Sequence, residues 1–269
     1  MTFDLRHMSG PFDIVGDVHG CADELLALLA RLGYEVAVEG TGERRGARIA
    51  APHGRHLVFV GDFVDRGPAS PDVLRIAMAA DAAGLGYAVI GNHDDKFRRW
   101  LKGSAVKISH GLEQTVAQMA GEPASFHAGV RAYLERLPYY LWLDGGALAV
   151  AHAGFRQEML GRTSGAARAF AVYGDTDGKR DESGLTIRYD WASAHTGQTR
   201  IVYGHTPIEQ AEWRFNTLCL DTGCCFGGAL TALRWPENEI VYVPARRTYA
   251  VRGRPFGHPP PREAAPAPA

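Results

Sequence analysis

The first hundred residues repeat one arrangement three times: an apolar run, a loop that opens on glycine and a polar residue, and then a helical pattern. The apolar runs cover residues 12–16, 56–61 and 86–91, and each has the length of a buried strand. After the first run, leucines recur at helical spacing until Gly33 interrupts the pattern. Repeated strand–loop–helix units are typical of an α/β fold with a largely parallel sheet.

The rest of the chain has a different pattern. Residues 35–52 are glycine-rich and charged, which predicts a surface hairpin or loop. Residues 108–137 are predicted to be helical, with a break at 121–123. The second half contains short apolar runs with few long helices between them, which predicts a second sheet packed on the first. These runs cover residues 139–143, 147–151, 199–203, 217–220, 229–233 and 239–243.

Composition limits the domain organisation and the classes of partner. We expect a single domain over residues 1–250 and a disordered tail over residues 251–269, which are rich in proline and alanine. The 29 basic and 30 acidic residues give a net charge of −1, which excludes a protein with an extended surface that coats nucleic acid. A nucleotide substrate in a local site stays possible. No apolar run is long enough to span a membrane, and four cysteines without disulfide or zinc spacing indicate the reducing cytoplasm.

Polar residues that can bind metal follow the predicted strands. The loops at the carboxyl ends of parallel strands meet at one edge of a sheet, so these side chains should converge. Together they offer too many oxygen and nitrogen ligands for one zinc ion and suit two adjacent divalent metals, with Asp62 able to bridge them. The residues are Asp17, His19, Asp62, Asp65, Asn92, His93, His152, His205 and Asp221.

Three ordered motifs give these residues a family context. They are Gly-Asp-Val-His-Gly at 16–20, Gly-Asp-Phe-Val-Asp-Arg-Gly at 61–67 and Gly-Asn-His-Asp at 91–94. With His152 and the Gly204-His205 pair, they resemble the signature of calcineurin-like metallophosphoesterases of the phosphoprotein phosphatase branch, over residues 12–245. The resemblance implies a four-layer αββα sandwich of two mixed sheets flanked by helices.

A narrower resemblance concerns two bacterial groups. The segments 91–96, 189–192, 203–207 and 221–224 are similar to PrpE-type phosphatases, described also as asymmetric dinucleoside tetraphosphate hydrolases, and to the phosphatase domain of bacterial polynucleotide kinase-phosphatase. The chain carries no phosphate-binding loop of the kinase type, so the stand-alone group fits better.

The resemblance implies a binuclear metal centre. The expected ions are two divalent transition metals, with manganese (Mn²⁺) favoured and nickel, cobalt, iron or zinc as alternatives. The first ion would be held by Asp17, His19 and Asp62, and the second by Asp62, Asn92, His152 and His205.

The family's catalytic roles fall on the neighbouring residues. The resemblance implies that a hydroxide bridging the two ions attacks phosphorus in line. His93 would protonate the leaving oxygen, with Asp65 orienting the imidazole. Arg66 would bind phosphate oxygens and stabilise the transition state, and Asn92 would also contact the substrate.

The expected function is the hydrolysis of phosphate esters or anhydrides on a small nucleotidic substrate, such as a dinucleoside polyphosphate or a nucleotide with a terminal or cyclic phosphate. The alternatives are a serine/threonine phosphoprotein phosphatase, a nuclease that uses the same metals, and a non-catalytic metal-binding scaffold. The sequence leaves the oligomeric state open.

The sequence is compatible with two roles for several side chains. Asp221 either takes part in the site or orders the turn at Gly223, and Lys96 either meets the substrate or is solvated. Adjacent Cys224 and Cys225 are expected to be inert packing residues. Eukaryotic phosphoprotein phosphatases, which the chain resembles, carry a second phosphate-binding arginine between the two late histidines. Arg156, Arg180 and Arg188 are the candidates here, and the sequence leaves open whether one of them has that role.

Overall fold

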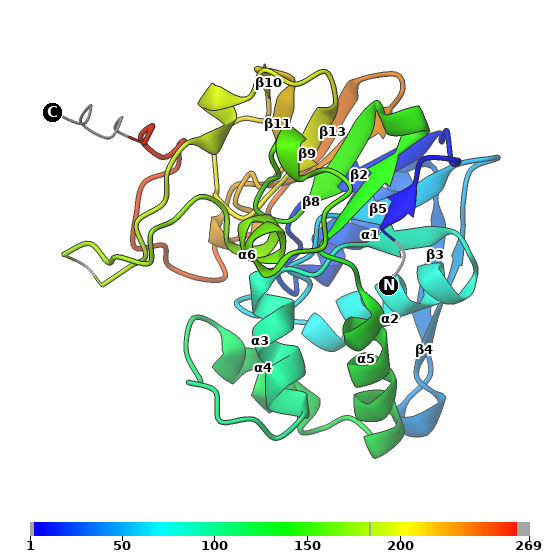
Figure 1. The fold of residues 1–269 in the computed structure, drawn as a ribbon. Helices are drawn as coiled ribbons and strands as arrows, with labels where there is room; N and C mark the ends of the chain where they lie inside the picture. The colour runs from blue at the N-terminus through cyan, green and yellow to red at the C-terminus, as the bar shows by residue number, and fades with distance from the viewer. Residues whose placement is uncertain (1–2, 183, 263–269) are drawn as a thin grey trace, which may run out of the picture.

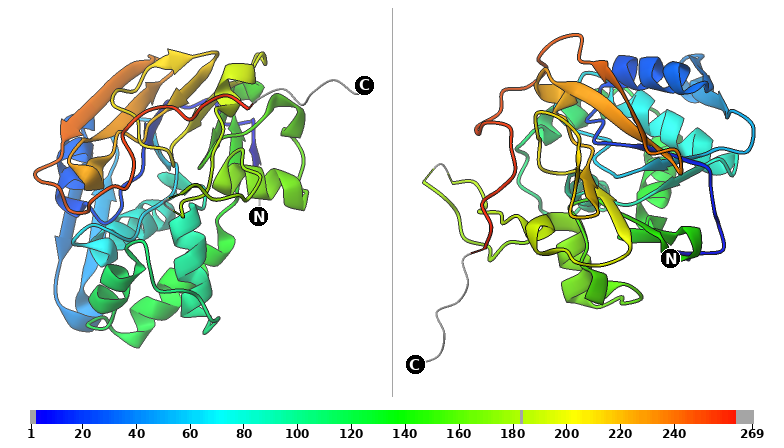
Figure 2. Two further views of the ribbon diagram at one scale, coloured as in Figure 1. Left: turned by 90° about the vertical axis from the view of Figure 1, so that its left-hand side faces the viewer. Right: turned by 90° about the horizontal axis from the view of Figure 1, so that it is seen from above.

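The computed structural model describes residues 3–182 and 184–262. Two mixed sheets pack face to face, and helices cover both outer faces (Figures 1 and 2). The four-layer αββα arrangement that the family resemblance implies is therefore confirmed. In the described part of the chain, every helix is too short or too polar to cross a membrane.

The first sheet contains the three strands of the repeated N-terminal units. Its strand order is β13-β12-β2-β5-β6, with β2, β5 and β6 parallel and β12 antiparallel to both neighbours. The strands are β2 (Phe12–Val15), β5 (His56–Phe59), β6 (Gly86–Ala88), β12 (Ala229–Trp235) and β13 (Glu239–Pro244).

The second sheet is built mainly from the middle of the chain, in the order β1-β7-β8-β9-β11-β10. The sequence predicts strands at both 229–233 and 239–243 but expects them in this sheet, whereas β12 and β13 extend the first sheet beside β2. Conversely, β1 from the N-terminus pairs with β7. The strands are β1 (Asp4–Leu5), β7 (Tyr140–Leu143), β8 (Leu148–Ala151), β9 (Arg200–Tyr203), β10 (Trp213–Arg214) and β11 (Thr217–Cys219).

The helices begin and end close to the predicted positions. Gly33 ends α1 in the left-handed conformation (φ 93°), and residues 108–137 hold two helices separated at 121–123. Helix α6 was not predicted. The helices are α1 (Ala22–Leu32), α2 (Ser70–Ala82), α3 (Asn92–Leu101), α4 (Leu112–Met119), α5 (Ala124–Arg136) and α6 (Gly165–Tyr173).

Shorter elements lie between these. Residues 35–52 form the expected hairpin, a separate two-stranded sheet. It consists of β3 (Glu35–Glu39) and β4 (Gly46–Ala50), joined through the 3₁₀ turn η1 (Gly42–Arg44). The other 3₁₀ turns are η2 (Asp144–Gly146), η3 (Gln157–Met159), η4 (Trp191–Ala194) and η5 (Cys224–Phe226).

Alternation along the strands divides the core into three layers. In β8, Leu148 and Val150 face the space between the sheets, while Ala149 and Ala151 pack toward α6 and η4. In β5, Val58 likewise faces the other sheet, and its neighbours face the helices α1, α2 and α5. This period of two is what a strand buried on both faces requires. The packing holds the carboxyl ends of both sheets side by side.

The C-terminal part of the chain differs from the expected tail. Residues 251–262 lie against the domain: Gly257 N donates to Pro207 O at 3.0 Å, and Asp190 N donates to Pro260 O at 2.8 Å. Arg262 Nη2 is 2.6 Å from Asp175 Oδ1. The backbone and guanidinium bonds order this part even though its composition is that of a linker. The remaining tail residues, 263–269, lie outside the described residues.

Candidate active site

The predicted site residues come together where the strands of both sheets end. Asp17 and His19 follow β2, Asp62 to Arg66 follow β5, and Asn92 and His93 open α3 after β6. From the second sheet, His152 follows β8, His205 follows β9 and Asp221 follows β11.

The carboxylate of Asp62 lies at the centre. Its Oδ2 is 3.4 Å from Nε2 of both His19 and His152, and its Oδ1 accepts a hydrogen bond from the backbone N–H of His93 at 3.0 Å. Two clusters of three buried ligand atoms share this residue, each within 4.8 Å: His19, Asp62 and His93, and Asp62, His152 and His205. One carboxylate common to two clusters is the geometry that a bridging ligand needs.

The histidine tautomers favour metal binding. Nδ1 of His19 is 2.8 Å from Val64 O, and Nδ1 of His152 is 3.0 Å from Val60 O. A carbonyl oxygen only accepts, so both Nδ1 atoms carry hydrogen and both Nε2 atoms present a lone pair. Burial lowers the pKa of His152 to about 3, so this ring is neutral at pH 7.

At His152, two acceptor atoms therefore face each other. Nε2 of His152 lies 3.0 Å from Asn92 Oδ1, itself an acceptor, and 3.0 Å from His205 Nδ1. Such a set of neutral nitrogen and amide oxygen atoms beside a carboxylate fits a divalent transition metal. The residues present are thus suited to the ions that the family implies.

Asp17 belongs to neither three-ligand cluster. Its two carboxylate oxygens accept from the backbone N–H of His205 at 3.2 and 3.0 Å, which ties the β2 loop to the β9 loop. Burial, followed by the charges of Asp221 and Asp62, raises the pKa of Asp17 well above its usual value. Several carboxylates buried so close together repel one another, and a bound cation would relieve that repulsion.

His93 and Asp65 form a buried pair. His93 Nδ1 is 2.6 Å from Asp65 Oδ2, while Asp65 Oδ1 accepts from the hydroxyl of Thr115 at 2.7 Å. Burial raises the pKa of Asp65 to about 7, and burial followed by the charge of Arg66 lowers the pKa of His93 well below its usual value. Thr115 lies on α4 and carried no local signal in the sequence.

Arg66 links the pair to the predicted metal-binding side chains. Its Nη2 is 2.8 Å from His93 Nε2, and its Nη1 is 2.5 Å from His19 Nε2. The guanidinium also stacks on the ring of Phe226, 5.0 Å from the centroid. The predicted phosphate-binding group therefore lies directly beside the predicted proton donor.

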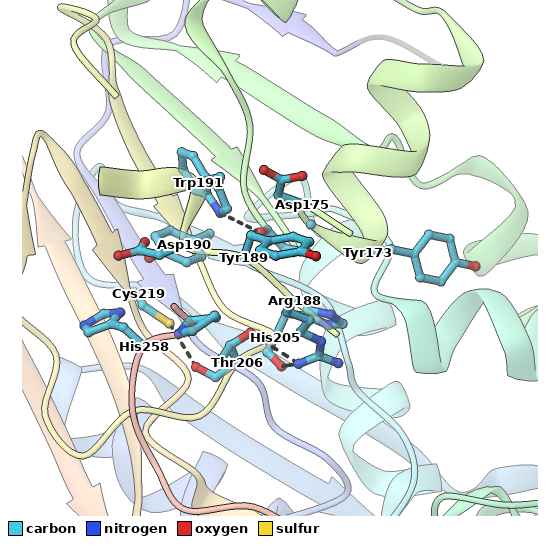
Figure 3. A pocket seen from close by; sticks show the side chains of 14 residues that line it. Tyr173, Asp175, Arg188, Tyr189, Asp190, Trp191, His205, Thr206, Cys219 and His258 are labelled. Atoms are coloured by element: carbon cyan, nitrogen blue, oxygen red, sulfur yellow. Dashed lines mark hydrogen bonds between the residues drawn. The ribbon is translucent and has the colours of Figure 1, made fainter. Parts of the chain in front are cut away.

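The structure distinguishes the three candidates for a second arginine. Arg188 Nη1 donates to His205 O at 3.0 Å and to Thr206 Oγ1 at 3.2 Å, and Figure 3 shows this guanidinium beside both residues. Burial lowers its pKa to about 10, and the charges of Asp221 and Asp62 oppose that shift. Arg156 instead pairs with Asp175 at 3.0 Å, and Arg180 is exposed and bonds Gly184 O.

A pocket adjoins this edge of the site. Arg188 and His205 line it together with aromatic side chains of the 173–191 segment and with His258 of the C-terminal segment (Figure 3). The position of His258 beside the site was not evident from the sequence, because its segment was expected to be a disordered tail.

The structure also shows the contacts of the residues for which the sequence left the role open. Asp221 is buried and its Oδ1 accepts from Gly223 N at 3.0 Å, so it does order that turn, yet its charge also acts on Asp17. Lys96 donates to Ser109 O at 2.7 Å and thereby ties α3 to the following loop. Cys224 and Cys225 are buried and free, which fits a packing role.

Curated relatives match nearly the whole chain. A protein of Anoxybacillus flavithermus named bis(5'-nucleosyl)-tetraphosphatase PrpE (asymmetrical) is 40% identical over 254 residues, covering 91% of this chain and 99% of the relative. The protein of the same name from Geobacillus thermodenitrificans is 43% identical over 237 residues, covering 87% of this chain and 94% of the relative.

Solved structures share the fold. A candidate diadenosine tetraphosphatase superposes with a TM-score of 0.64 at 24% identity, covering 90% of this chain and 96% of the other. A serine/threonine phosphatase from Saccharomyces cerevisiae superposes with a TM-score of 0.59 at 15% identity, covering 94% of this chain and 85% of the other. At these identities, the likeness establishes the architecture alone.

The family follows from a match to most of the chain. The model of calcineurin-like phosphoesterases matches residues 10–234, a range that contains every predicted metal ligand and Asp221. The match confirms the family resemblance and the enzyme class that the motifs predict, and the family implies divalent metal ions as cofactors. This chain belongs to the calcineurin-like phosphoesterase family of hydrolases.

Proposed function

We propose that this protein is a two-metal phosphohydrolase that cleaves a phosphoanhydride of a dinucleoside polyphosphate. The observation that carries the proposal is the pair of three-residue clusters that share Asp62, one of which contains His93, with Arg66 in contact with that histidine. The nucleotidic substrate is supported by relatives at 40–43% identity that are named for dinucleoside tetraphosphate cleavage.

The metal ligands in this proposal are those that the motifs predict. Asp17, His19 and Asp62 would hold one ion, and Asp62, Asn92, His152 and His205 the other. Divalent ions bound there would act as Lewis acids on the phosphoryl group and lower the pKa of the attacking water. The mixed oxygen and nitrogen ligands suit a divalent transition metal, and we propose manganese as the native one.

The protein's own side chains would position the substrate and supply a proton. Arg66 and Arg188 would each direct a guanidinium at the phosphoryl oxygens, where charge builds up in the transition state. His93 would donate a proton from Nε2 to the leaving oxygen, and Asp65 would hold its Nδ1. Asn92 would serve both as a metal ligand and as a contact for the substrate.

We also propose that residues 1–250 form one catalytic domain, because both sheets contribute ligands to the same site. The cytoplasmic location stays a prediction.

The test is a matrix of metals and substrates on protein stripped of metal. Mn²⁺, Ni²⁺, Co²⁺, Zn²⁺ and Mg²⁺ would each be assayed with p-nitrophenyl phosphate, its bis ester, diadenosine tetraphosphate, a 2′,3′-cyclic nucleotide and a phosphothreonine peptide. We expect the highest kcat/KM for diadenosine tetraphosphate, with Mn²⁺ the best activator. His93→Ala should lower the rate roughly 10²–10³-fold, within the range typical of lost catalytic groups.

Other outcomes would redirect the proposal. A preference for the phosphopeptide would make the protein a phosphoprotein phosphatase, and a preference for the bis ester would make it a phosphodiesterase or nuclease. Hydrolysis that Asp62→Asn leaves unchanged would contradict the shared-ligand site. No hydrolysis with any metal would favour a scaffold.

A further inference from the structure

The segment of residues 251–262, called here the C-terminal strap, reaches the active site from outside the family-matched range. It runs along the loop between α6 and η4, and the left view in Figure 2 shows its red trace crossing that face of the molecule. Arg254 anchors it: the guanidinium bonds Asp181 Oδ2 at 3.1 Å and Leu185 O at 3.1 Å.

An aromatic pair joins the strap to the phosphate-binding arginine. The ring of Phe256 meets that of Phe226 edge to face, with centroids 6.5 Å apart, and packs so closely on Gly223 that a Cβ there would overlap it. Arg66 stacks on Phe226 at 5.0 Å, and Arg252 stacks on Phe256 at 5.1 Å. Two guanidinium groups therefore rest on the two members of one aromatic pair.

The charge of Arg252 acts on the same buried carboxylate, that of Asp221, as the charges of the two arginines of the site. Burial raises the pKa of Asp221 to about 6, and the charges of Arg66, Arg252 and Arg188 all lower it. Within residues 3–182 and 184–262, the Arg252 side chain has one hydrogen bond, to Pro255 O, and no ion pair. Its guanidinium thus keeps free donors, whereas that of Arg254 is engaged by the loop.

We propose that Arg252 forms a subsite for a phosphate group adjacent to the one that is cleaved, so that the strap favours polyphosphate over monophosphate substrates. This inference rests on the proposed function. A polyphosphate chain brings additional anionic oxygens within reach of a third guanidinium, which can bind them in a bidentate fashion. Phe256 acts as a positioning residue, because it holds Arg252 and contacts no reacting group.

The experiment compares two substrates and two inhibitors on the Mn²⁺-loaded full-length enzyme. Arg252→Ala should raise the KM for diadenosine tetraphosphate roughly tenfold or more, the usual effect of losing a charged hydrogen bond. The KM for p-nitrophenyl phosphate should change far less, at most about twofold. With p-nitrophenyl phosphate as the substrate, Arg252→Ala should weaken inhibition by inorganic tripolyphosphate by the same factor as it raises the KM for diadenosine tetraphosphate. Inhibition by orthophosphate should not weaken. Arg252→Lys should recover part of the loss, and Phe256→Ala should reproduce part of it.

Arg247→Ala is the matched control. Arg247 is exposed and stacks at the same 5.1 Å on Tyr249, a ring outside the Phe226–Phe256 pair. Its replacement should leave both substrates unaffected. Equal losses on both substrates in Arg252→Ala, or no loss on either, would overturn the subsite. If the wild-type enzyme cleaves only the monophosphate, the proposed substrate falls, while the ratio of tripolyphosphate to orthophosphate inhibition still decides the role of Arg252.

Discussion

Single residues of the site adopt backbone conformations that side chains rarely tolerate. His19, Asp62, Asp65, Arg66 and His205 all have φ between 45° and 75°. Such left-handed residues cost free energy and persist only where the surrounding structure enforces them. Here, closely packed neighbouring backbone holds these residues in the left-handed conformation. The same close packing leaves no room for a Cβ at the positions that flank the motifs, which explains why those positions are glycines.

Gly204 tests this packing, because a Cβ at this position would overlap the carboxylate of Asp17. We expect Gly204→Ala to destabilise the fold by about 1–3 kcal/mol, as overpacked substitutions do, and to weaken Mn²⁺ binding. Urea unfolding and calorimetric metal titration would measure both. Gly46→Ala is the control, since nothing lies within 4 Å of a Cβ there. Equal metal affinities in the two variants would refute the argument.

Thr115 tests the orientation of the acid pair. Thr115→Val removes the hydroxyl that donates to Asp65, and kcat should fall roughly tenfold as His93 loses its fixed orientation. The Thr115 bond lowers the pKa of Asp65, so its removal raises that pKa above about 7 and moves the acidic limb of the kcat profile to higher pH. Thr217→Val, a buried threonine bonded to Arg214 O, should lose similar stability without a change in the pH profile.

At the scale of elements, the start of α3 is fastened to the loop after β5. Asp94 is fully buried and its carboxylate accepts three backbone N–H groups: Asp62 at 2.7 Å, Phe63 at 2.9 Å and Gly91 at 3.1 Å. One side chain thus satisfies the helix terminus and the loop that carries Asp62, the proposed shared metal ligand. The family motif contains this aspartate, but its role became evident only from these contacts.

Replacing that carboxylate should loosen both elements. Asp94→Asn leaves one amide nitrogen facing a backbone donor, and we expect a loss of about 2–4 kcal/mol in the free energy of unfolding, as for an unsatisfied buried group. Asp23→Asn, which breaks an exposed pair with Arg246, should cost less than about 1 kcal/mol. Comparable losses in the two variants, measured by denaturant unfolding, would contradict the proposed tie.

For the whole molecule, the ligand clusters join the two sheets. His19 belongs to the first sheet's loops and His152 and His205 to the second, with Asp62 between them. A metal that binds only the folded arrangement stabilises it by mass action.

Removing metal should therefore lower the melting temperature. A metal concentration of a hundred times Kd adds about 2.7 kcal/mol to the free energy of unfolding. For a chain of this size, that corresponds to a melting temperature higher by roughly 5 °C or more. Thermal unfolding of chelated protein, with and without added Mn²⁺, would measure the shift. In Asp62→Asn, added Mn²⁺ should raise the melting temperature much less. A rise as large as that of the wild-type protein would show that the ions bind at another site.

Much of the fold and of the candidate site could be predicted from the sequence. Short apolar runs, each with the length of a buried strand, predicted β2, β5, β7, β8 and β9. Gly33 predicted the end of α1. Local geometry decides these features, so a short window of sequence contains them. The ordered motifs predicted which side chains would converge, since loops at the carboxyl ends of parallel strands share one edge.

Which elements pair depended on the tertiary structure. An apolar run does not specify which strand it will pair with. The antiparallel pairing of β12 with β2, which come from opposite ends of the chain, therefore could not be predicted from the sequence of either strand. The contacts of Thr115 with Asp65, of Arg188 with His205 and of the strap with Phe226 likewise join distant segments. The sequence by itself determined the local elements and the metal-binding residue types, whereas long-range packing decided which residues support them.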